Sequence, residues 1–141
     1  MIVIDTNVLS ALMRDVPERR VVEWLDRQAA ESIWITSVTL FEARLGLALL
    51  PKGKRRKALE SAFDKLLAED LEGRVLDFDQ PAAKAAAQLA ARRQREGQTI
   101  DMRDTQIAGI VIARRAELAT RNVTHFSDLN VNVINPWDTD Q

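Results

Sequence analysis

The chain contains no cysteine among its 141 residues, so disulfides, zinc–thiolate sites and thiol nucleophiles are excluded. It also has no long apolar run: residues 45–50 form the most apolar later stretch, which is too short to span a bilayer. The first residues lack the basic segment, long apolar segment and cleavage site of a signal peptide. We therefore expect a soluble, cytoplasmic protein with no membrane partner.

The chain has no strong charge of either sign, since 20 Lys and Arg are balanced by 21 Asp and Glu to give a net charge of −1. Such a balance gives no global attraction to nucleic acids or membranes, so any nucleic-acid binding has to use a local basic patch. Hydrophobic residues at 46% and charged residues at 29% are typical of a globular protein. The length favours a single domain over residues 1–141.

Short apolar runs alternate with segments of helical periodicity along the whole chain. We expect strands at residues 2–4, 33–35, 74–78, 118–120 and 131–134. Between them we expect helices at residues 7–14, from 17 onward, and at 38–50, 55–69, 79–96 and 102–115. This alternation predicts an α/β fold with a parallel sheet covered by helices on both faces.

Asp5 follows the first buried strand directly, and helical spacing begins at once after it. In open parallel α/β sheets, ligands bind outside the carboxyl ends of the strands, so Asp5 is a candidate site residue. Asp5, Thr6 or Asn7 could instead simply cap the helix, because Asp, Asn and Thr are favoured N-cap residues.

Glu42 is predicted to lie on the apolar face of its helix, where an unpaired carboxylate is expensive to bury. A capping box between Thr39 and Glu42 is the structural alternative, although Ser37 lies closer to the preceding strand and is the better N-cap. Asp104 faces inward in the first turn of its own helix, with Asp101 as the expected N-cap.

These three carboxylates would repel one another if the fold gathered them in one crevice. A hard divalent cation such as Mg²⁺ or Mn²⁺ removes that repulsion, because it takes oxygen ligands and can activate water at a phosphodiester. The chain has no GxSxG, P-loop or GxGxxG motif that would supply another chemistry. A receiver domain with Asp5 as phosphate acceptor is disfavoured, since the acidic pair and the lysine it needs are not visible.

Four ordered segments resemble PIN-domain ribonucleases, in particular toxins of the VapC/FitB type. They are residues 5–10 (DTNVLS), 36–42 (TSVTLFE), 104–108 (DTQIA) and 120–123 (TRNV). The resemblance implies a PIN-like domain with a five-stranded parallel sheet of order 3-2-1-4-5. It also implies that the first and fourth strands are adjacent, and that Asp5 and Asn122 meet at the switch point between them.

The same resemblance implies a function, namely a Mg²⁺- or Mn²⁺-dependent endoribonuclease that acts as the toxin of a toxin–antitoxin pair. Asp5, Glu42 and Asp104 would hold the metal, with Thr6 and Asn122 as supporting residues. The implied partners are RNA, a small cognate antitoxin and a second copy of the chain, with DNA reached only through the antitoxin.

One position departs from the family pattern. Many members carry a further aspartate just before the phenylalanine that matches Phe126, whereas this chain has His125 there and Asp128 two residues beyond. The roles of His125 and Asp128 stay open: the lone histidine could be a ligand, a proton-transfer group or simply solvated. The alternative function is therefore a catalytically weak PIN-fold subunit that acts mainly in a DNA-binding toxin–antitoxin complex.

A basic run between the third and fourth helices includes Lys54, Arg55 and Arg56 and is a candidate for RNA binding. A solvated start of a helix explains the same residues. Cations are unfavourable at a helix N-terminus, however, which keeps a functional role open.

Overall fold

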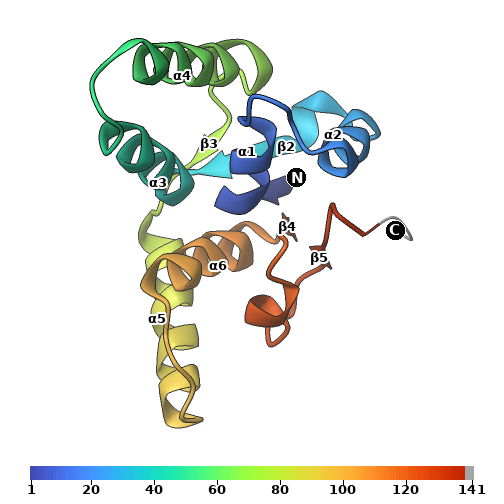
Figure 1. The fold of residues 1–141 in the computed structure, drawn as a ribbon. Coiled ribbons are helices and arrows are strands. Elements are labelled where there is room, and N and C mark those ends of the chain that lie inside the picture. The colour runs from blue at the N-terminus through green and yellow to red at the C-terminus, as the bar shows by residue number, and fades with distance from the viewer. Residues whose placement is uncertain (139–141) are drawn as a thin grey trace.

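The computed structural model describes residues 1–138 and contains one sheet of five parallel strands (Figure 1). The strand order is β3-β2-β1-β4-β5, so the predicted α/β class and strand order are confirmed. The strands are β1 (Ile2–Ile4), β2 (Ile33–Thr36), β3 (Val75–Leu76), β4 (Glu117–Ala119) and β5 (Val133–Ile134).

Six α-helices connect and cover the strands: α1 (Thr6–Leu12), α2 (Arg19–Asp26), α3 (Ser37–Ala48), α4 (Lys54–Lys65), α5 (Gln80–Arg95) and α6 (Met102–Arg114). Three short helical turns complete the chain: η1 (Ala30–Ser32), the π-helical η2 (Leu66–Asp70) and η3 (Val123–Phe126). Over residues 1–138, no helix is both long enough and apolar enough to cross a membrane.

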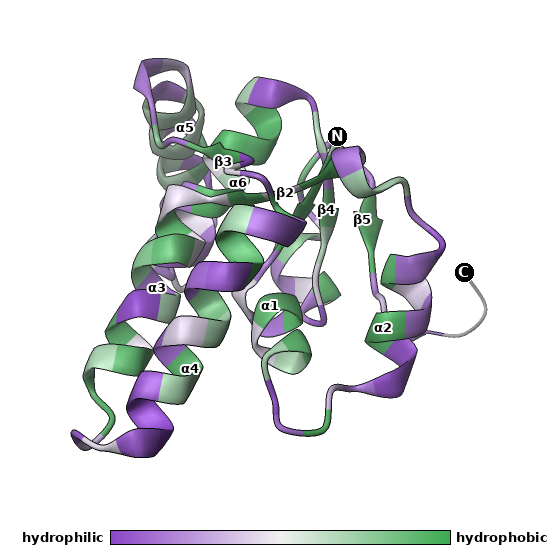
Figure 2. Ribbon diagram, turned by 90° about the horizontal axis from the view of Figure 1, so that it is seen from above, coloured by the Kyte–Doolittle hydropathy of each residue, from purple (hydrophilic) through white to green (hydrophobic). Residues whose placement is uncertain are grey.

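Each face of the sheet has its own apolar core, because successive side chains of a strand point to opposite faces. Ile2 and Ile4 of β1 pack into a cluster that includes residues of α1, α2 and α4, whereas Val3 packs with α5 and α6. The strands are accordingly among the most hydrophobic segments of the chain (Figure 2). The result is a three-layer arrangement in which the sheet lies between two groups of helices.

Several predicted boundaries differ from those observed. The helix predicted from residue 17 begins at Arg19, with Glu18 as its N-cap residue, so Pro17 lies outside it. The strands predicted at 74–78 and 131–134 are only two residues long, because β3 and β5 are edge strands that pair on one side. The strand predicted at 118–120 ends at Ala119, which leaves Thr120 just beyond it.

The alanine-rich α5 lies directly against α6, and the two helices run side by side in Figure 1. Gly109 of α6 makes this approach possible, since a Cβ atom there would lie 2.5 Å from the Ala82 carbonyl oxygen and 2.6 Å from Ala86 Cβ. Because α6 begins beside the carboxyl edge of the sheet, this contact also fixes the position of Asp104.

We predict that Gly109→Ala destabilises the protein by roughly 1–3 kcal/mol or more, because the added methyl group meets backbone atoms that have no room to move. Urea unfolding followed by circular dichroism measures the change. Gly46→Ala is the matched control, since a Cβ atom at Gly46 of α3 meets nothing within 4 Å. That control should be neutral or stabilising by about 0.5–1 kcal/mol. Equal effects of the two substitutions would contradict the prediction.

Candidate active site

The switch point of the sheet lies between β1 and β4, which are parallel neighbours with Ile4 opposite Ala119. The chain continues from β1 into α1 and from β4 into the loop before η3. Asp5 and Thr120 therefore come to lie side by side at the carboxyl ends of these strands. The Asp5 amide donates to the Ala119 carbonyl at 2.9 Å, and the Thr120 hydroxyl donates to Asp5 Oδ2 at 2.8 Å.

Asp5 is buried, with 3% of its surface exposed. It is the N-cap residue of α1: its Oδ1 accepts from the Thr6 amide at 2.8 Å, and its Oδ2 accepts weakly from Asn7 Nδ2 at 3.4 Å. All of these donors are neutral. Burial, assisted by the negative charges of Asp104 and Glu42, raises the pKa of Asp5 to about 6 against the opposing effect of the Thr120 and Thr6 hydrogen bonds.

Asp5 therefore does cap α1, as the capping interpretation predicts. The groups that donate to it in this role are neutral and give its carboxylate no positively charged partner. Among residues 1–138, no Lys, Arg or His forms an ion pair with Asp5 within 4.0 Å. A buried carboxylate that has only neutral donors and two acidic neighbours is a favourable environment for a cation.

Glu42 is not part of a capping box. Helix α3 begins at Ser37 with Thr36 as N-cap, and the Thr36 hydroxyl accepts from the Thr39 amide at 3.1 Å. The prediction of Ser37 as N-cap is wrong because α3 begins one residue earlier than expected. Thr39 lies inside the helix, and Glu42 Oε1 instead accepts from the Thr6 hydroxyl at 2.7 Å.

Threonine hydroxyls connect Glu42 to the strand before α3. Thr6 and Thr39 have their hydroxyl oxygens 3.1 Å apart, and the Thr36 hydroxyl donates to Thr39 at 3.4 Å. Thr36 and Thr39 are completely buried. This chain of hydroxyls holds the predicted supporting residue Thr6 against Glu42 and joins α1 to α3.

Asp104 lies in the first turn of α6, and Asp101 is the N-cap, as predicted: its Oδ1 accepts from the Asp104 amide at 3.0 Å. Partial burial raises the pKa of Asp104, and the charges of Asp101 and Glu42 act in the same direction, whereas His125 lowers it. His125 Nδ1 lies 3.3 Å from Asp104 Oδ2, and most of the histidine side chain is exposed.

Thr120, rather than Asn122, is the residue that meets Asp5. The backbone amide of Asn122 donates to the Thr120 hydroxyl at 3.1 Å, so Asn122 supports Asp5 only through Thr120. Asn7 braces the same loop, because its Oδ1 accepts from the Arg121 amide at 3.2 Å. A signal for Thr120 was present in the sequence: it is the polar last residue of the strand predicted at 118–120, which the family resemblance places beside the strand of Asp5.

Asp128 lies outside this cluster and pairs with Arg93 of α5. Arg93 Nε and Nη2 donate to the two carboxylate oxygens at 2.9 and 2.8 Å, and Nη2 also donates to the His125 carbonyl at 2.8 Å. Arg93 is 5% exposed. Its hydrogen bonds lower the pKa of Asp128 to about 2. The pair anchors η3 on α5, and with it the histidine beside Asp104.

We predict that Asp128→Asn lowers the free energy of unfolding at pH 7 by roughly 2–4 kcal/mol, because it leaves the Arg93 guanidinium buried without its anion. The pKa of Asp128 is depressed in the folded state, so its stabilisation is fully present above the unfolded value of about 4 and is lost as the pH falls toward 2. Denaturant unfolding at several pH values should show the two proteins converging below pH ~4.

Arg92→Gln is the control for this prediction, since Arg92 contacts Asp128 at 3.3 Å from a half-exposed position. It should change stability by less than about 1 kcal/mol. A pH-independent difference between wild type and Asp128→Asn would contradict the prediction.

The three candidate carboxylates influence one another electrostatically, but as arranged they do not form a complete set of metal ligands. Residues 1–138 contain no group of three or more His, Asp or Glu side chains that could hold a metal ion as arranged. The negative charges of Asp104 and Glu42 nevertheless contribute to the raised pKa of Asp5, after the larger effect of burial. The donor set consists of hard oxygen atoms around a buried, cation-free carboxylate, and this chemistry fits Mg²⁺ or Mn²⁺.

A groove of about 570 Å³ lies along α1, α3 and α4, and Glu42 is the one of the three candidate carboxylates that lines it. Thr6 and Glu42 line one part of it, and Arg55 from the basic run lines another. Arg56 is already paired with Glu60, to which its Nε donates at 2.7 Å. Lys54 is the exposed first residue of α4. Of the predicted basic residues, the structure therefore places Arg55 in the same groove as Glu42.

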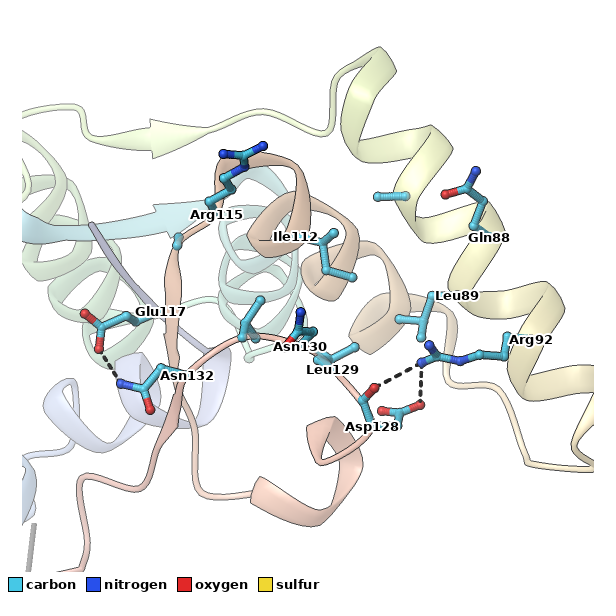
Figure 3. Close-up of a pocket in the computed structure, with 13 residues that line it drawn as sticks. Gln88, Leu89, Arg92, Ile112, Arg115, Glu117, Asp128, Leu129, Asn130 and Asn132 are labelled. Atoms are coloured by element: carbon cyan, nitrogen blue, oxygen red, sulfur yellow. Dashed lines mark hydrogen bonds and ion pairs between the residues drawn. The ribbon is translucent and has the colours of Figure 1, made fainter.

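A larger cavity of about 760 Å³ lies at the opposite, amino-terminal edge of β4 and β5 (Figure 3). Arg92 and Asp128 face each other on its wall, and Asn132 donates to Glu117 at 2.7 Å. None of the three candidate carboxylates lines it. This cavity therefore lies at the end of the sheet away from the three candidate carboxylates.

Known proteins share this fold and are similar in sequence along nearly the whole chain. The family model described as PIN domain matches residues 2–131. VapC ribonuclease Y4jK from Sinorhizobium fredii is 38% identical over 138 residues, 98% of this chain and 99% of that protein. Toxin FitB from Neisseria gonorrhoeae is 36% identical over 137 residues, 97% of this chain and 99% of that protein. The chain belongs to the PIN-domain family, which confirms the resemblance inferred from its sequence.

A solved structure agrees with this assignment over the full chain. The structure of FitAB bound to an IR36 DNA fragment contains a chain that superposes with a TM-score of 0.91 at 35% identity. The superposition covers 100% of this chain and 99% of that one.

Proposed function

We propose that this protein is a metal-dependent endoribonuclease that acts as the toxin of a toxin–antitoxin pair. The observation that carries the proposal is the buried Asp5 carboxylate at the switch point, whose pKa is raised to about 6 beside Glu42 and Asp104. Its relatives include a VapC ribonuclease and a toxin, which supports the same activity.

Asp5, Glu42 and Asp104 are the proposed metal-holding residues, with Mg²⁺ or Mn²⁺ as the ion. A bound divalent cation would supply activation of water and neutralisation of charge developing on the phosphodiester. In this proposal the protein holds the carboxylate oxygens at fixed positions before the ion binds. Ligands that became ordered only on binding would lose conformational entropy, and this loss would weaken metal binding.

The surrounding residues fix those oxygens. Thr6 holds one oxygen of Glu42 with its hydroxyl and one oxygen of Asp5 with its amide. Thr120 holds the other oxygen of Asp5, and Asn122 supports Thr120 through its backbone amide. Thr6, Thr120 and Asn122 are accordingly positioning residues in this proposal. His125 lies beside Asp104 and is placed to influence that carboxylate. The buried Arg93–Asp128 pair holds His125 in this position.

RNA is the proposed substrate, and the groove between α1, α3 and α4 is the proposed path for its backbone. Arg55 offers a cation in the same groove as Glu42, and Lys54 lies next to it on α4. Arg56 contributes positive charge nearby but is already paired with Glu60. Local cations of this kind compensate for the absence of net positive charge in the chain as a whole.

The proposed protein partner is a small cognate antitoxin, and contact with DNA would be indirect, through that partner. FitAB has been solved as an assembly on DNA, which supports this arrangement for a protein of the same fold at 35% identity. We also propose a homodimer and a cytoplasmic location, both on the resemblance to VapC/FitB-type toxins.

The purified protein should cleave RNA with Mg²⁺ or Mn²⁺ and lose that activity in EDTA. Glu42→Gln should reduce cleavage by roughly two orders of magnitude, because glutamine preserves the acceptor for the Thr6 hydroxyl but removes the negative charge that a cation needs. It should also shrink the rise in Tm that Mn²⁺ causes, since this rise reflects binding to the folded state. Thermal melting with and without Mn²⁺, together with RNA cleavage, measures both effects.

Glu23→Gln is the matched control, because it removes the same charge from an exposed pair on α2. It should behave as wild type. Cleavage that survives exhaustive chelation would sink the proposal. Wild-type cleavage and a wild-type Mn²⁺ effect in Glu42→Gln would show that Glu42 is not a ligand.

A second function is favoured by one specific observation. The position where many relatives have a fourth carboxylate holds His125, and the nearby Asp128 is engaged by Arg93. The protein could on this ground be a catalytically weak subunit that acts mainly within a DNA-binding complex with its antitoxin. The cleavage assay separates the two functions: stable binding to the antitoxin and DNA without metal-dependent cleavage would favour the second.

An adjacent small open reading frame should encode a protein that co-purifies with this chain and blocks cleavage. The physical reason is that an acidic crevice with a cation-free carboxylate accepts a basic side chain as well as a metal ion. Co-expression, pull-down and the cleavage assay together test this. Harmless expression of the toxin candidate alone, combined with the absence of any such partner in a pull-down from the native host, would contradict it.

A further inference from the structure

Arg103 lies beside the acidic cluster, in the first turn of α6 and directly before Asp104. Its Nη1 is 3.5 Å from Glu42 Oε2. Its guanidinium carbon lies 5.3 Å from the centre of the Phe41 ring, which belongs to α3. Arg103 thus bridges the two helices that carry Glu42 and Asp104.

The contact between Arg103 and Glu42 is loose. It consists of one long approach, and 46% of the arginine side chain is exposed. Pairs of this kind contribute little to stability, in contrast to the buried two-point contact of Arg93 with Asp128. Glu42 is moreover already held by the Thr6 hydroxyl at 2.7 Å. Arg103 is therefore not needed to position Glu42.

Two features of Arg103 and the neighbouring Phe41 do not favour the stability of the fold. A cation in the first turn of a helix opposes the helix dipole. Phe41 is a large apolar side chain that is 56% exposed. Stacking on Phe41 fixes the plane of the guanidinium, which reduces the entropy lost when its edge binds a ligand.

We propose that Arg103 binds a phosphate of the RNA substrate at this site. Its guanidinium lies beside Glu42; a divalent cation held by Glu42 would weaken that attraction and leave the guanidinium available to a phosphate. The fork of an arginine matches two phosphate oxygens, which a single carboxylate oxygen at 3.5 Å does not satisfy. This inference rests on the proposed nuclease function and adds a substrate-binding residue to it.

The kinetic test compares wild type with Arg103→Gln, Arg103→Lys and Arg19→Gln on a fluorophore–quencher RNA library of random sequence in Mn²⁺. Arg103→Gln should lower kcat/KM by roughly 10- to 100-fold, mainly through a higher KM. Arg103→Lys should recover part of the loss, because it keeps the charge but not the fork. Arg19→Gln removes a charge from an exposed pair on α2 and should leave the kinetics unchanged.

Binding of a labelled single-stranded oligouridine at several salt concentrations gives a second readout. With Ca²⁺ in place of Mn²⁺, and with the RNA shown to be intact on a denaturing gel, Arg103→Gln should reduce the slope of log Kd against log salt by about 0.7, one phosphate contact. In EDTA the slopes of wild type and variant should agree, since Arg103 is then paired with Glu42. Equal slopes in Ca²⁺ would overturn the proposal.

The Mn²⁺-induced rise in Tm distinguishes this role from a merely structural one. If Arg103 only competes with the cation for Glu42, Arg103→Gln should keep the rise or enlarge it. A smaller rise would mean that Arg103 orients Glu42, and the proposal would fail. If wild type shows no metal-dependent cleavage, the proposed function fails. If wild type cleaves and Arg103→Gln matches it in kinetics and salt slope, only this inference fails.

Discussion

The carboxylate of Asp5 is buried at the end of the central strand, and every hydrogen-bond donor that reaches it is neutral. This is an unfavourable condition for a folded protein, because the charged form of the group loses its hydration without gaining a counter-charge. Its donors come from two segments: Thr6 and Asn7 follow it directly in α1, whereas Thr120 reaches it only in the folded chain. The other two acidic groups of the site, Glu42 and Asp104, are arranged around this buried carboxylate.

The two halves of the site are supported in different ways. Asp104 is carried by α6, which is locked against α5 by the close approach at Gly109. Glu42 is carried by α3, which lines the groove together with α4 and contacts α1 through a hydroxyl hydrogen bond as well as through the apolar core. A ligand that bridges Glu42 and Asp104 therefore connects α3 to the closely packed pair α5 and α6.

Much of this organisation could be predicted from the sequence, because the signals are local. An apolar strand that ends in Asp5, and carboxylates on inward helix faces at Glu42 and Asp104, can be recognised from periodicity alone. The strand order came from the family resemblance. Thr120, Arg103 and the Arg93–Asp128 pair were missed because each depends on which loop or helix end packs beside another. The N-cap of α3 was misplaced by one residue, since Thr36 and Ser37 are both favoured N-cap residues and nothing local distinguishes them.

The threonine hydroxyls beside Glu42 form a chain with a direction. Because Glu42 can only accept, Thr6 has to donate to it, Thr39 then donates to Thr6, and Thr36 donates to Thr39. The ionised carboxylate thus sets the orientation of three hydroxyl dipoles, ending in the buried turn where β2 becomes α3. An electrostatic change at Glu42 is consequently transmitted to the beginning of α3 by reorientation of protons, without movement of any heavy atom.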